Sequence, residues 1–312
     1  MHTLEWHPIE SEEDEARALI VDAKGAAQFK LPTVAPSPEG SVSTADSACS
    51  ASDVSATSSI DAPAGREFSC GTWDPHHARL SVFAVGSAVQ QWDTRAKSLS
   101  TMIASAGTDG LGLCSISYNP NRPWYVSTGG EDGEVRIWDL RAASSSSSSS
   151  SSTAASAGGG GDGGGEGSRT GPAGSLPRAL VLRMAGHAHA ATTCAYNPCH
   201  DQLIASGSDD GTVNMWRASS VSSLPIYDDI VQQEEARLDA EGGDGEGPLD
   251  DDARRGTRMA PDALLKRGKG HKDSVTRTCW SAYNPWVLVS ASWDGRVVFT
   301  AVPAKEKMRV LL

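Results

Sequence analysis

The amino-acid sequence predicts an all-β protein, a β-propeller in which small antiparallel sheets repeat along the chain. A block of the form aromatic–x–Pro recurs, and each copy leads into an apolar, strand-like run and a polar turn. Asp-Gly pairs stand between several of these runs, which is a strong signal for β-hairpins. The blocks are also regularly spaced, with 45 residues from Pro75 to Pro120 and 46 from Trp92 to Trp138. This spacing is close to the roughly 40–45 residues of a four-stranded propeller blade.

The blocks define the blades in chain order. They are Trp6-His7-Pro8, Trp73-Asp74-Pro75, Tyr118-Asn119-Pro120, Tyr196-Asn197-Pro198 and Trp280-Ser281-Ala282-Tyr283-Asn284-Pro285. The last three continue into a further strand through Asp-Gly turns at Asp132-Gly133, Asp210-Gly211 and Asp294-Gly295. We therefore expect a partial blade at 1–31, blades at 67–101, 106–141 and 180–218, and a C-terminal blade at 265–312.

Three long stretches interrupt the repeat. They are rich in Ser, Ala and Pro at 36–65, in Ser and Gly at 142–174, and in acidic residues at 227–257. Such compositions bury too little apolar surface to offset the entropy of an ordered chain, so we expect three disordered inserts between blades. The acidic insert is open to two interpretations. It is either a docking loop for a basic partner surface or a solvated loop that keeps the protein soluble.

Charge and hydropathy exclude several classes of function. The formal net charge of the 312 residues is −12, and residues 228–252 alone carry −10 of it. Nucleic-acid recognition requires a clustered basic surface, so we expect no nucleic-acid partner. The apolar runs are far shorter than the roughly 20 residues that span a bilayer, and the N-terminus lacks the features of a signal peptide. We therefore expect a soluble, intracellular chain without membrane insertion.

Two histidines point to a polar network that repeats with the blades. His187 and His271 each follow a glycine and each precede the Asp of their turn, Asp210 or Asp294, by 23 residues. We expect a buried His–Asp contact in each blade, extended by a strand serine and, in the first case, by a tryptophan. The network residues are then His187, Asp210, Ser206 and Trp216, together with His271, Asp294 and Ser290. A catalytic dyad is the alternative, but recurrence in each repeat favours a structural role. Asp109 stands where the blade at 106–141 would have its histidine, and Thr300 where the last blade would have its tryptophan.

No catalytic or metal-binding motif is present in the sequence. Nucleotide-binding, hydrolase and metalloprotease fingerprints are absent. The nearest candidates for a metal site are His76-His77 near Cys70, and Cys194 with Cys199-His200, but neither has a second matched pair of ligands. The six cysteines form no C-x-x-C pair, and we expect Cys70, Cys114, Cys194 and Cys279 to be small buried strand residues. We expect no catalytic residues, no cofactor and no metal.

The repeats resemble those of WD40 repeat proteins. Several segments resemble one family among them, the EARP-interacting proteins, also called EARP and GARP complex-interacting proteins. The matching segments are Gly71 to His77 with Gln91 to Arg95, Tyr118 to Asn121, Tyr196 to Leu203, Ser292 to Arg296, and the ending from Val302-Pro303 to Val310-Leu311-Leu312. The acidic insert also falls where that family carries an acidic loop.

The resemblance implies a non-catalytic, seven-bladed adaptor. In that family the adaptor binds the multisubunit EARP and GARP tethering complexes of endosomes and the trans-Golgi network, and it supports endosomal recycling and retrograde vesicle traffic. A cytoplasmic protein, peripheral at those membranes, is implied. Two features depart from the family: the Ser/Gly tract at 142–174, and a start at about the third blade. We expect an N-terminally truncated propeller of about 4–5 blades with an exposed edge.

A second hypothesis comes from two W-D-x-R endings, Trp92 to Arg95 and Trp138 to Arg141. They resemble the motif of WD40 substrate receptors for cullin-4 ubiquitin ligases, in which Arg95 and Arg141 would face the ligase adaptor. The alternative is that each arginine only pairs with a neighbouring aspartate. We take Arg95, Arg141, Trp124 and Trp293 as candidate partner-binding residues, because propellers bind partners through charged and aromatic side chains on loops.

Overall fold

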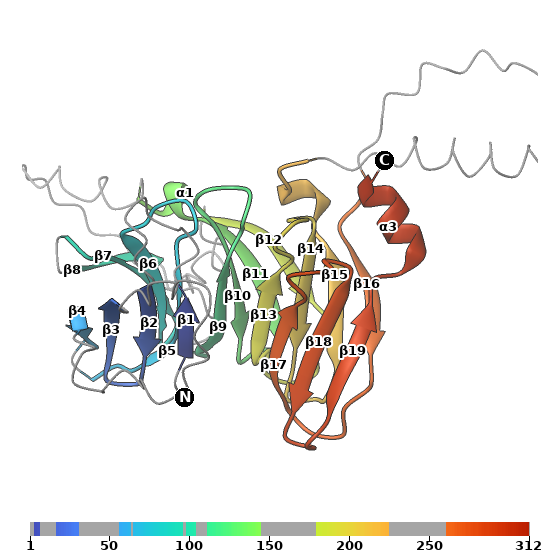
Figure 1. Ribbon diagram of the computed structural model, residues 1–312, viewed down its shortest axis with the longest axis horizontal. Helices are drawn as coiled ribbons and strands as arrows, with labels where there is room; N and C mark the ends of the chain where they lie inside the picture. Colours follow the sequence, from blue (N-terminus) through green and yellow to red (C-terminus); the bar gives the residue numbers. More distant parts are fainter. Residues whose placement is uncertain are drawn as a thin grey trace, which may run out of the picture.

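A computed structural model of the protein describes residues 3–6, 17–30, 56–63, 65–95, 98–103, 111–144, 179–224 and 260–311. Within these residues the chain forms five antiparallel sheets, four with four strands and one with three. The sheets follow one another along the chain and stand around a common centre (Figure 1). This is the all-β propeller architecture that the repeats predict.

The elements follow in chain order. The first sheet contains β1 (Thr3–Trp6), β2 (Arg17–Val21), β3 (Gly25–Lys30) and β4 (Ala56–Asp61). The second contains β5 (Phe68–Trp73), β6 (Leu80–Val85), β7 (Ala88–Asp93) and β8 (Ser98–Ile103). The third contains β9 (Leu113–Tyr118), β10 (Tyr125–Gly130), β11 (Glu134–Asp139) and β12 (Leu180–Ala185). The fourth contains β13 (Thr193–Tyr196), β14 (Leu203–Gly207), β15 (Val213–Arg217) and β16 (Ala263–Gly268). The fifth contains β17 (Val275–Trp280), β18 (Val287–Ser292) and β19 (Val297–Ala301). Helix α1 (Leu140–Ser144), the 3-10 turn η2 (Ser219–Val221) and helix α3 (Ala304–Leu311) complete the described elements.

The first strands of neighbouring sheets lie side by side, β5 against β9, β9 against β13, and β13 against β17. Because successive strands run in opposite directions, the connections gather at two ends of the sheets. The first and third strands of the sheets finish at one end, where the described aromatic–x–Pro blocks turn, and we call it the Pro end. The Asp-Gly turns and the approaches to the first strands lie at the opposite end, which we call the Asp-Gly end.

The Asp-Gly turns close the hairpins as the sequence predicts. Gly133, Gly211 and Gly295 adopt φ values of 77°, 71° and 74°. This left-handed backbone is costly for residues that carry a Cβ atom, so glycine is the residue that fits. The preceding aspartate accepts a hydrogen bond from the N–H two residues further on, for example Thr212 N–H to Asp210 Oδ1 at 2.8 Å.

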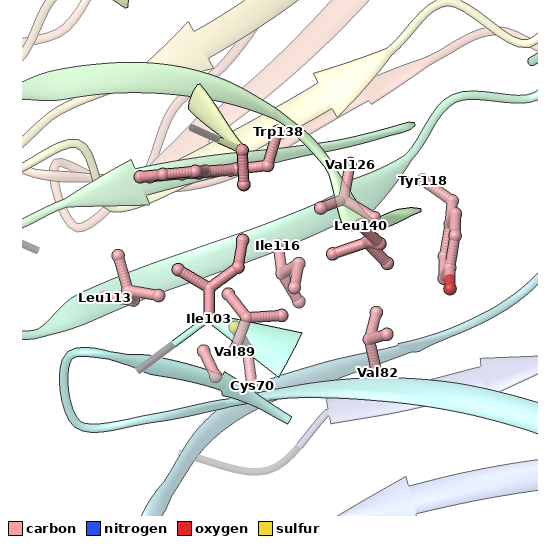
Figure 2. Close-up of a cluster of buried hydrophobic side chains, with 12 residues drawn as sticks. Cys70, Val82, Val89, Ile103, Leu113, Ile116, Tyr118, Val126, Trp138 and Leu140 are labelled. Carbon is pink, nitrogen blue, oxygen red and sulfur yellow. The ribbon is translucent and has the colours of Figure 1, made fainter. Parts of the chain in front are cut away.

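Apolar side chains fill the space between neighbouring sheets. Val82 and Val89 of the second sheet face Ile116, Val126 and Trp138 of the third (Figure 2). The three valines are fully buried and Trp138 is 1% exposed. A buried side chain of this size stabilises the fold by about 1.5–3 kcal/mol. The strands of such a sheet are therefore apolar on both faces, since each face packs against a neighbouring sheet.

The sheets are offset by one strand from the blocks expected at 180–218 and 265–312. β12 pairs with β11 and β16 pairs with β15, so the first strand of each block completes the preceding sheet. The expected insert at 36–65 needs a correction, because residues 56–61 form β4 against β3. Backbone hydrogen bonds hold such an outer strand, and a Ser/Thr-rich segment supplies them as well as an apolar one. The segments 36–55, 145–174 and 227–257 lie outside the described residues.

The cysteines do not all occupy buried positions. Cys70 and Cys194 are buried, Cys114 is half-buried, and Cys279 is exposed, contrary to the expectation for that residue. Neighbouring residues of a strand point to opposite faces of the sheet. Cys279 follows the buried Thr278 and so lies on the other face of β17, which no sheet covers among the described residues.

Candidate functional site

The histidine network of the fourth sheet gathers at the Asp-Gly end. The side chain of His187 is fully buried, and its Nε2 lies 2.7 Å from Ser206 Oγ. The indole N–H of Trp216 donates to the same oxygen at 2.8 Å. His187 Nδ1 lies 3.0 Å from Thr212 Oγ1 and 3.8 Å from Oδ1 of Asp210. The four residues named from the sequence therefore meet in one cluster, which Thr212 joins.

The electrostatics of this cluster keep the imidazole neutral. Burial lowers the pKa of His187, and the nearby carboxylate of Asp210 opposes that shift. Burial on its own raises the pKa of Asp210, but hydrogen bonds from the N–H of Ala188 and from Thr212 outweigh it and lower the pKa to about 2. An enclosed, neutral histidine with satisfied ring nitrogens is suited to joining strands rather than to proton transfer.

The fifth sheet carries a shorter version of the same cluster. His271 Nε2 lies 2.8 Å from Ser290 Oγ, and its Nδ1 lies 3.5 Å from Oδ1 of Asp294. The N–H of Lys272 donates to Asp294 at 2.9 Å and is the main cause of the lowered pKa of that carboxyl. No indole donor joins this cluster, because Thr300 stands at the position that Trp216 occupies in the fourth sheet.

The third sheet keeps the indole contact and replaces the rest. Trp138 Nε1 donates to Thr128 Oγ1 at 2.9 Å. Beside it, the guanidinium of Arg136 is 3% exposed and pairs with Asp132 and Glu134. Asp109, which takes the place of the histidine in the sequence, lies outside the described residues.

Arg95 and Arg141 lie at the Pro end, just after the third strands of two consecutive sheets. Each side chain forms two hydrogen bonds to the aspartate of its own W-D pair, at 3.2 and 3.0 Å for Arg95 with Asp93, and at 3.0 and 2.8 Å for Arg141 with Asp139. The side chains of the two arginines are 64% and 57% exposed. They therefore form a matched pair of accessible guanidinium groups, each held in place by a carboxylate.

The two candidate tryptophans differ in accessibility. Trp124 is half-buried, packs against the core between the second and third sheets, and lies 5.1 Å from the ring of His77. Its φ of 71° marks it as a turn residue under local strain. Trp293 is 76% exposed at the Asp-Gly end of the fifth sheet. Of the two, Trp293 has the accessible ring that a partner surface needs.

A series of hydrogen bonds joins the turns of successive aromatic–x–Pro blocks, and the sequence patterns did not predict it. His76 Nε2 lies 3.0 Å from the carbonyl oxygen of Asn119, the Asn119 amide donates to Asp201 at 3.2 Å, and the Asn197 amide donates to the carbonyl oxygen of Pro285 at 2.5 Å. The signal was present in the sequence, because an Asp or Asn precedes the proline in four of the five blocks. These links join the second sheet to the third, the third to the fourth, and the fourth to the fifth at the Pro end.

The centre of the propeller contains a small cavity of about 140 Å³ between β5, β9, β13 and β17. Its lining includes the thiols of Cys70, Cys114 and Cys194 and several hydroxyl groups. Burial, with the nearby charge of Glu131, raises the pKa of the Cys114 thiol to about 11, which makes it a poor nucleophile.

The candidate metal ligands are engaged elsewhere. His77 Nδ1 lies 2.8 Å from Asp74 Oδ2, and the ring of His200 stacks on that of Trp286 with a distance of 4.4 Å between the ring centroids. In the part of the chain that the structure describes, no group of three or more His, Cys, Asp or Glu side chains is arranged to hold a metal ion. Among the helices of the described residues, none has the length and apolar character that a membrane crossing requires.

Comparison with known proteins identifies WD40 repeats in this chain. The family model "WD domain, G-beta repeat" matches residues 96–139, 178–217 and 263–299. Each match begins at or next to the fourth strand of one sheet and continues into the next sheet, in agreement with the strand offset described above. Two solved structures support the fold alone. A chain in the crystal structure of the mitotic checkpoint complex is 13% identical with a TM-score of 0.50, covering 96% of this chain and 61% of that one. A chain in the crystal structure of an active polycomb repressive complex 2 in the basal state is 12% identical with a TM-score of 0.54, covering 97% and 50%.

Curated relatives carry names that refer to two protein complexes. "EARP and GARP complex-interacting protein 1" of Homo sapiens is 27% identical over 265 residues, which are 83% of this chain and 56% of the relative. "EARP-interacting protein 1" of Caenorhabditis elegans is 28% identical over 248 residues, which are 78% of this chain and 54% of the relative. The chain thus spans about half the length of these relatives.

Proposed function

We propose that this WD40 chain is a non-catalytic adaptor that binds the EARP and GARP tethering complexes and acts in endosomal recycling and retrograde vesicle traffic. The observation that carries the proposal is the similarity over 83% of the chain to a protein named for interaction with those two complexes. A series of packed sheets with accessible side chains on its loops is suited to such a role. On this proposal the protein resides in the cytoplasm, peripherally at endosomes and the trans-Golgi network.

The accessible side chains at the two ends of the sheets are the proposed contacts with the tethering complexes. Trp293 offers a large exposed ring at the Asp-Gly end, and Arg95 and Arg141 offer two guanidinium groups at the Pro end. Aromatic and arginine side chains of this kind contribute most to protein–protein affinity. Their own aspartates hold the arginines in place, so little side-chain entropy is lost when a partner binds.

Affinity purification of the tagged chain from its own cells, followed by mass spectrometry, tests the proposal. We expect enrichment of tethering-complex subunits relative to a tagged WD40 protein of unrelated function. Trp293→Ala is expected to reduce that enrichment, whereas Val181→Ala, a matched control at a 44% exposed apolar residue of β12, is expected to leave it unchanged. Absence of every tether subunit from the purified material would contradict the proposal.

A second candidate function is substrate receptor of a cullin-4 ubiquitin ligase. The observation that favours it is the identical placement of Arg95 and Arg141, each exposed and each paired with its W-D aspartate. A double variant, Arg95→Ala with Arg141→Ala, is expected to lose recovery of the ligase adaptor in a pull-down while the fold is retained. Unchanged recovery would remove this role from the motif, and it would leave the tethering proposal untouched.

A further inference from the structure

Trp293 belongs to a small cluster at the Asp-Gly end, where the fourth and fifth sheets meet. Its N–H donates to the carbonyl oxygen of Ser274 at 3.1 Å. The hydroxyl of Ser274 donates to Oδ1 of Asp209 in the turn of the fourth sheet, and the N–H of Ser274 donates to Oδ1 of Asp273 at 2.7 Å. An aromatic residue and two acidic residues therefore lie around one serine, and we call these four residues the Ser274 cluster.

Three members of the Ser274 cluster are accessible to a partner. Trp293 is 76% exposed, and Asp209 and Asp273 are also exposed. The face of an indole ring attracts cations, and a planar guanidinium can stack on it. A carboxylate pairs with the same guanidinium through directed hydrogen bonds. The three side chains together offer what one arginine of a partner needs, an aromatic face and two anionic acceptors.

The exposure of this position is independent of whether another sheet follows. In the third, fourth and fifth sheets, the residue before the Asp-Gly pair donates its N–H to the carbonyl oxygen of a residue shortly before the first strand. The pairs are Glu131 with Gly112, Asp209 with Ala190 and Trp293 with Ser274, at 3.0, 3.1 and 3.1 Å. Glu131 and Asp209 are exposed although a further sheet packs beside each of their sheets. The position therefore points to solvent in every one of the three sheets.

The ring of Trp293 is not used by a cation of the chain itself. In the described part of the chain, the cation–π contacts join Arg122 and Arg141 to Tyr125, and Lys307 to Trp286. Lys272 lies next to the cluster and is exposed, but none of these contacts places its ammonium over the ring. The face of the indole is therefore available to a cation from outside.

We propose that the Ser274 cluster binds an arginine within a basic segment of a protein partner. The guanidinium stacks on Trp293 and donates to Asp209 and Asp273, whose carboxylates Ser274 holds beside the ring. The formal net charge of the chain, −12, attracts a basic segment over a longer range and disfavours phosphate-bearing partners. The inference deepens the proposed function and rests on it in one respect, because it takes Trp293 as a contact with a protein partner.

Binding of the purified 312-residue chain to a short fluorescein-labelled Gly/Ser peptide with spaced arginines, measured by fluorescence anisotropy, tests the proposal. Counterpart peptides carry lysine, leucine or glutamate at the arginine positions. We expect the arginine peptide to bind most tightly, because lysine supplies the charge without the planar stacking group. Lysine is expected to follow, and leucine and glutamate to bind least. Affinity for the arginine peptide is expected to fall as salt is added.

Variants of the cluster separate the ring from the carboxylates. Trp293→Ala is expected to weaken binding of the arginine peptide about threefold to tenfold. Asp209→Asn and Asp273→Asn are each expected to weaken it about twofold to fivefold. Asp209→Asn keeps an oxygen that can accept the Ser274 hydroxyl, so it removes the charge and leaves that contact in place. Lys272→Gln removes a neighbouring like charge and is expected to strengthen binding.

Two matched controls remove the same groups away from the cluster. Phe299→Ala deletes a 71% exposed ring of β19, and Asp61→Asn neutralises an exposed carboxylate of the first sheet. Both are expected to bind the arginine peptide as the unaltered chain does. Circular dichroism checks that all variants fold.

Equal affinity for the arginine and leucine peptides would overturn the proposal, because the cluster would then be an apolar contact. Equal losses of affinity in Phe299→Ala and Trp293→Ala would overturn it as well. The peptide assay contains no tethering subunit, so the two proposals fail separately. A chain that prefers the arginine peptide but recovers no tether subunit contradicts the proposed function alone. A chain that recovers tether subunits but shows no preference for arginine contradicts this inference alone.

Discussion

The buried ion pair between Arg217 of β15 and Glu306 of α3 fastens the C-terminal helix to the fourth sheet. The guanidinium donates to the carboxylate at 2.7 Å and to the carbonyl oxygen of Pro261 at 3.0 Å. The two side chains are 4% and 9% exposed. Glu306→Leu removes the carboxylate and leaves the arginine charge enclosed. Loss of one partner of a buried pair costs about 3–5 kcal/mol.

We expect the lower end of that range, about 3 kcal/mol, because Arg217 keeps its bond to Pro261 and the eight-residue helix can detach to admit water. Urea denaturation measures this loss of unfolding free energy, and calorimetry measures the melting temperature, which is expected to fall by roughly 6–12 °C for a domain of this size. Adding Arg217→Met removes the unpaired charge, so the double variant is expected within about 1 kcal/mol of the unaltered chain.

Arg141→Met serves as the control, since it breaks an exposed ion pair and is expected to change stability by less than about 1 kcal/mol. A Glu306→Leu variant as stable as the unaltered chain would refute the reasoning. So would a double variant as unstable as the single one, because the cost would then come from lost packing and not from the enclosed charge.

Three further predictions concern the Asp-Gly end and its turns. Trp216→Phe deletes the N–H that Ser206 accepts and is expected to cost about 1–2 kcal/mol in urea denaturation, and an unchanged midpoint would contradict this. Burial lowers the pKa of His187 in the folded state below the value near 6.5 that the residue has in the unfolded chain. The neutral histidine therefore contributes its full stabilisation to the fold above about pH 6.5. As the pH falls below that value the free energy of unfolding decreases, by at most about 1.4 kcal/mol per pH unit. Urea titrations from about pH 7 to about pH 5 are expected to show a smaller slope for His187→Gln than for the unaltered chain. Gly133→Ala places a Cβ 2.7 Å from the carbonyl oxygen of His189. It is expected to lower the free energy of unfolding by at least about 1 kcal/mol more than the control Gly86→Ala, because Gly86 also has a positive φ but no atom near its Cβ position. Equal losses of stability in the two variants would refute the clash.

The repeat and its hairpins were predictable because they depend on residues close together in the chain. The Asp-Gly turns, the strands on either side of them and the His–Asp spacing are all local patterns, and the structure brings the members of each pattern together. The fourth strands of the third and fourth sheets, β12 and β16, fall in the blocks expected at 180–218 and 265–312 but pair with the preceding sheet. β12 pairs with β11 across residues 140–179, and no local pattern states which sheet such a strand joins.

Surface roles were less predictable than strands. Trp124 and Trp293 looked equivalent as loop aromatics, yet one packs against the core beside His77 and the other is exposed. Cys194 and Cys279 both stand shortly before a block turn, yet their registers point them to opposite faces of their sheets. Burial of a side chain depends on the neighbouring sheet, which the local sequence does not contain.

The sequence by itself therefore determined the propeller class, the hairpins with their Asp-Gly turns, and the residues of the two histidine clusters, because each rests on a period or spacing within one repeat. The tertiary structure alone decided which strand completes the third and fourth sheets, how the turns link neighbouring sheets at the Pro end, and which loop and strand side chains are buried. Those features depend on contacts between repeats, where residues distant in the chain meet and exclude water together.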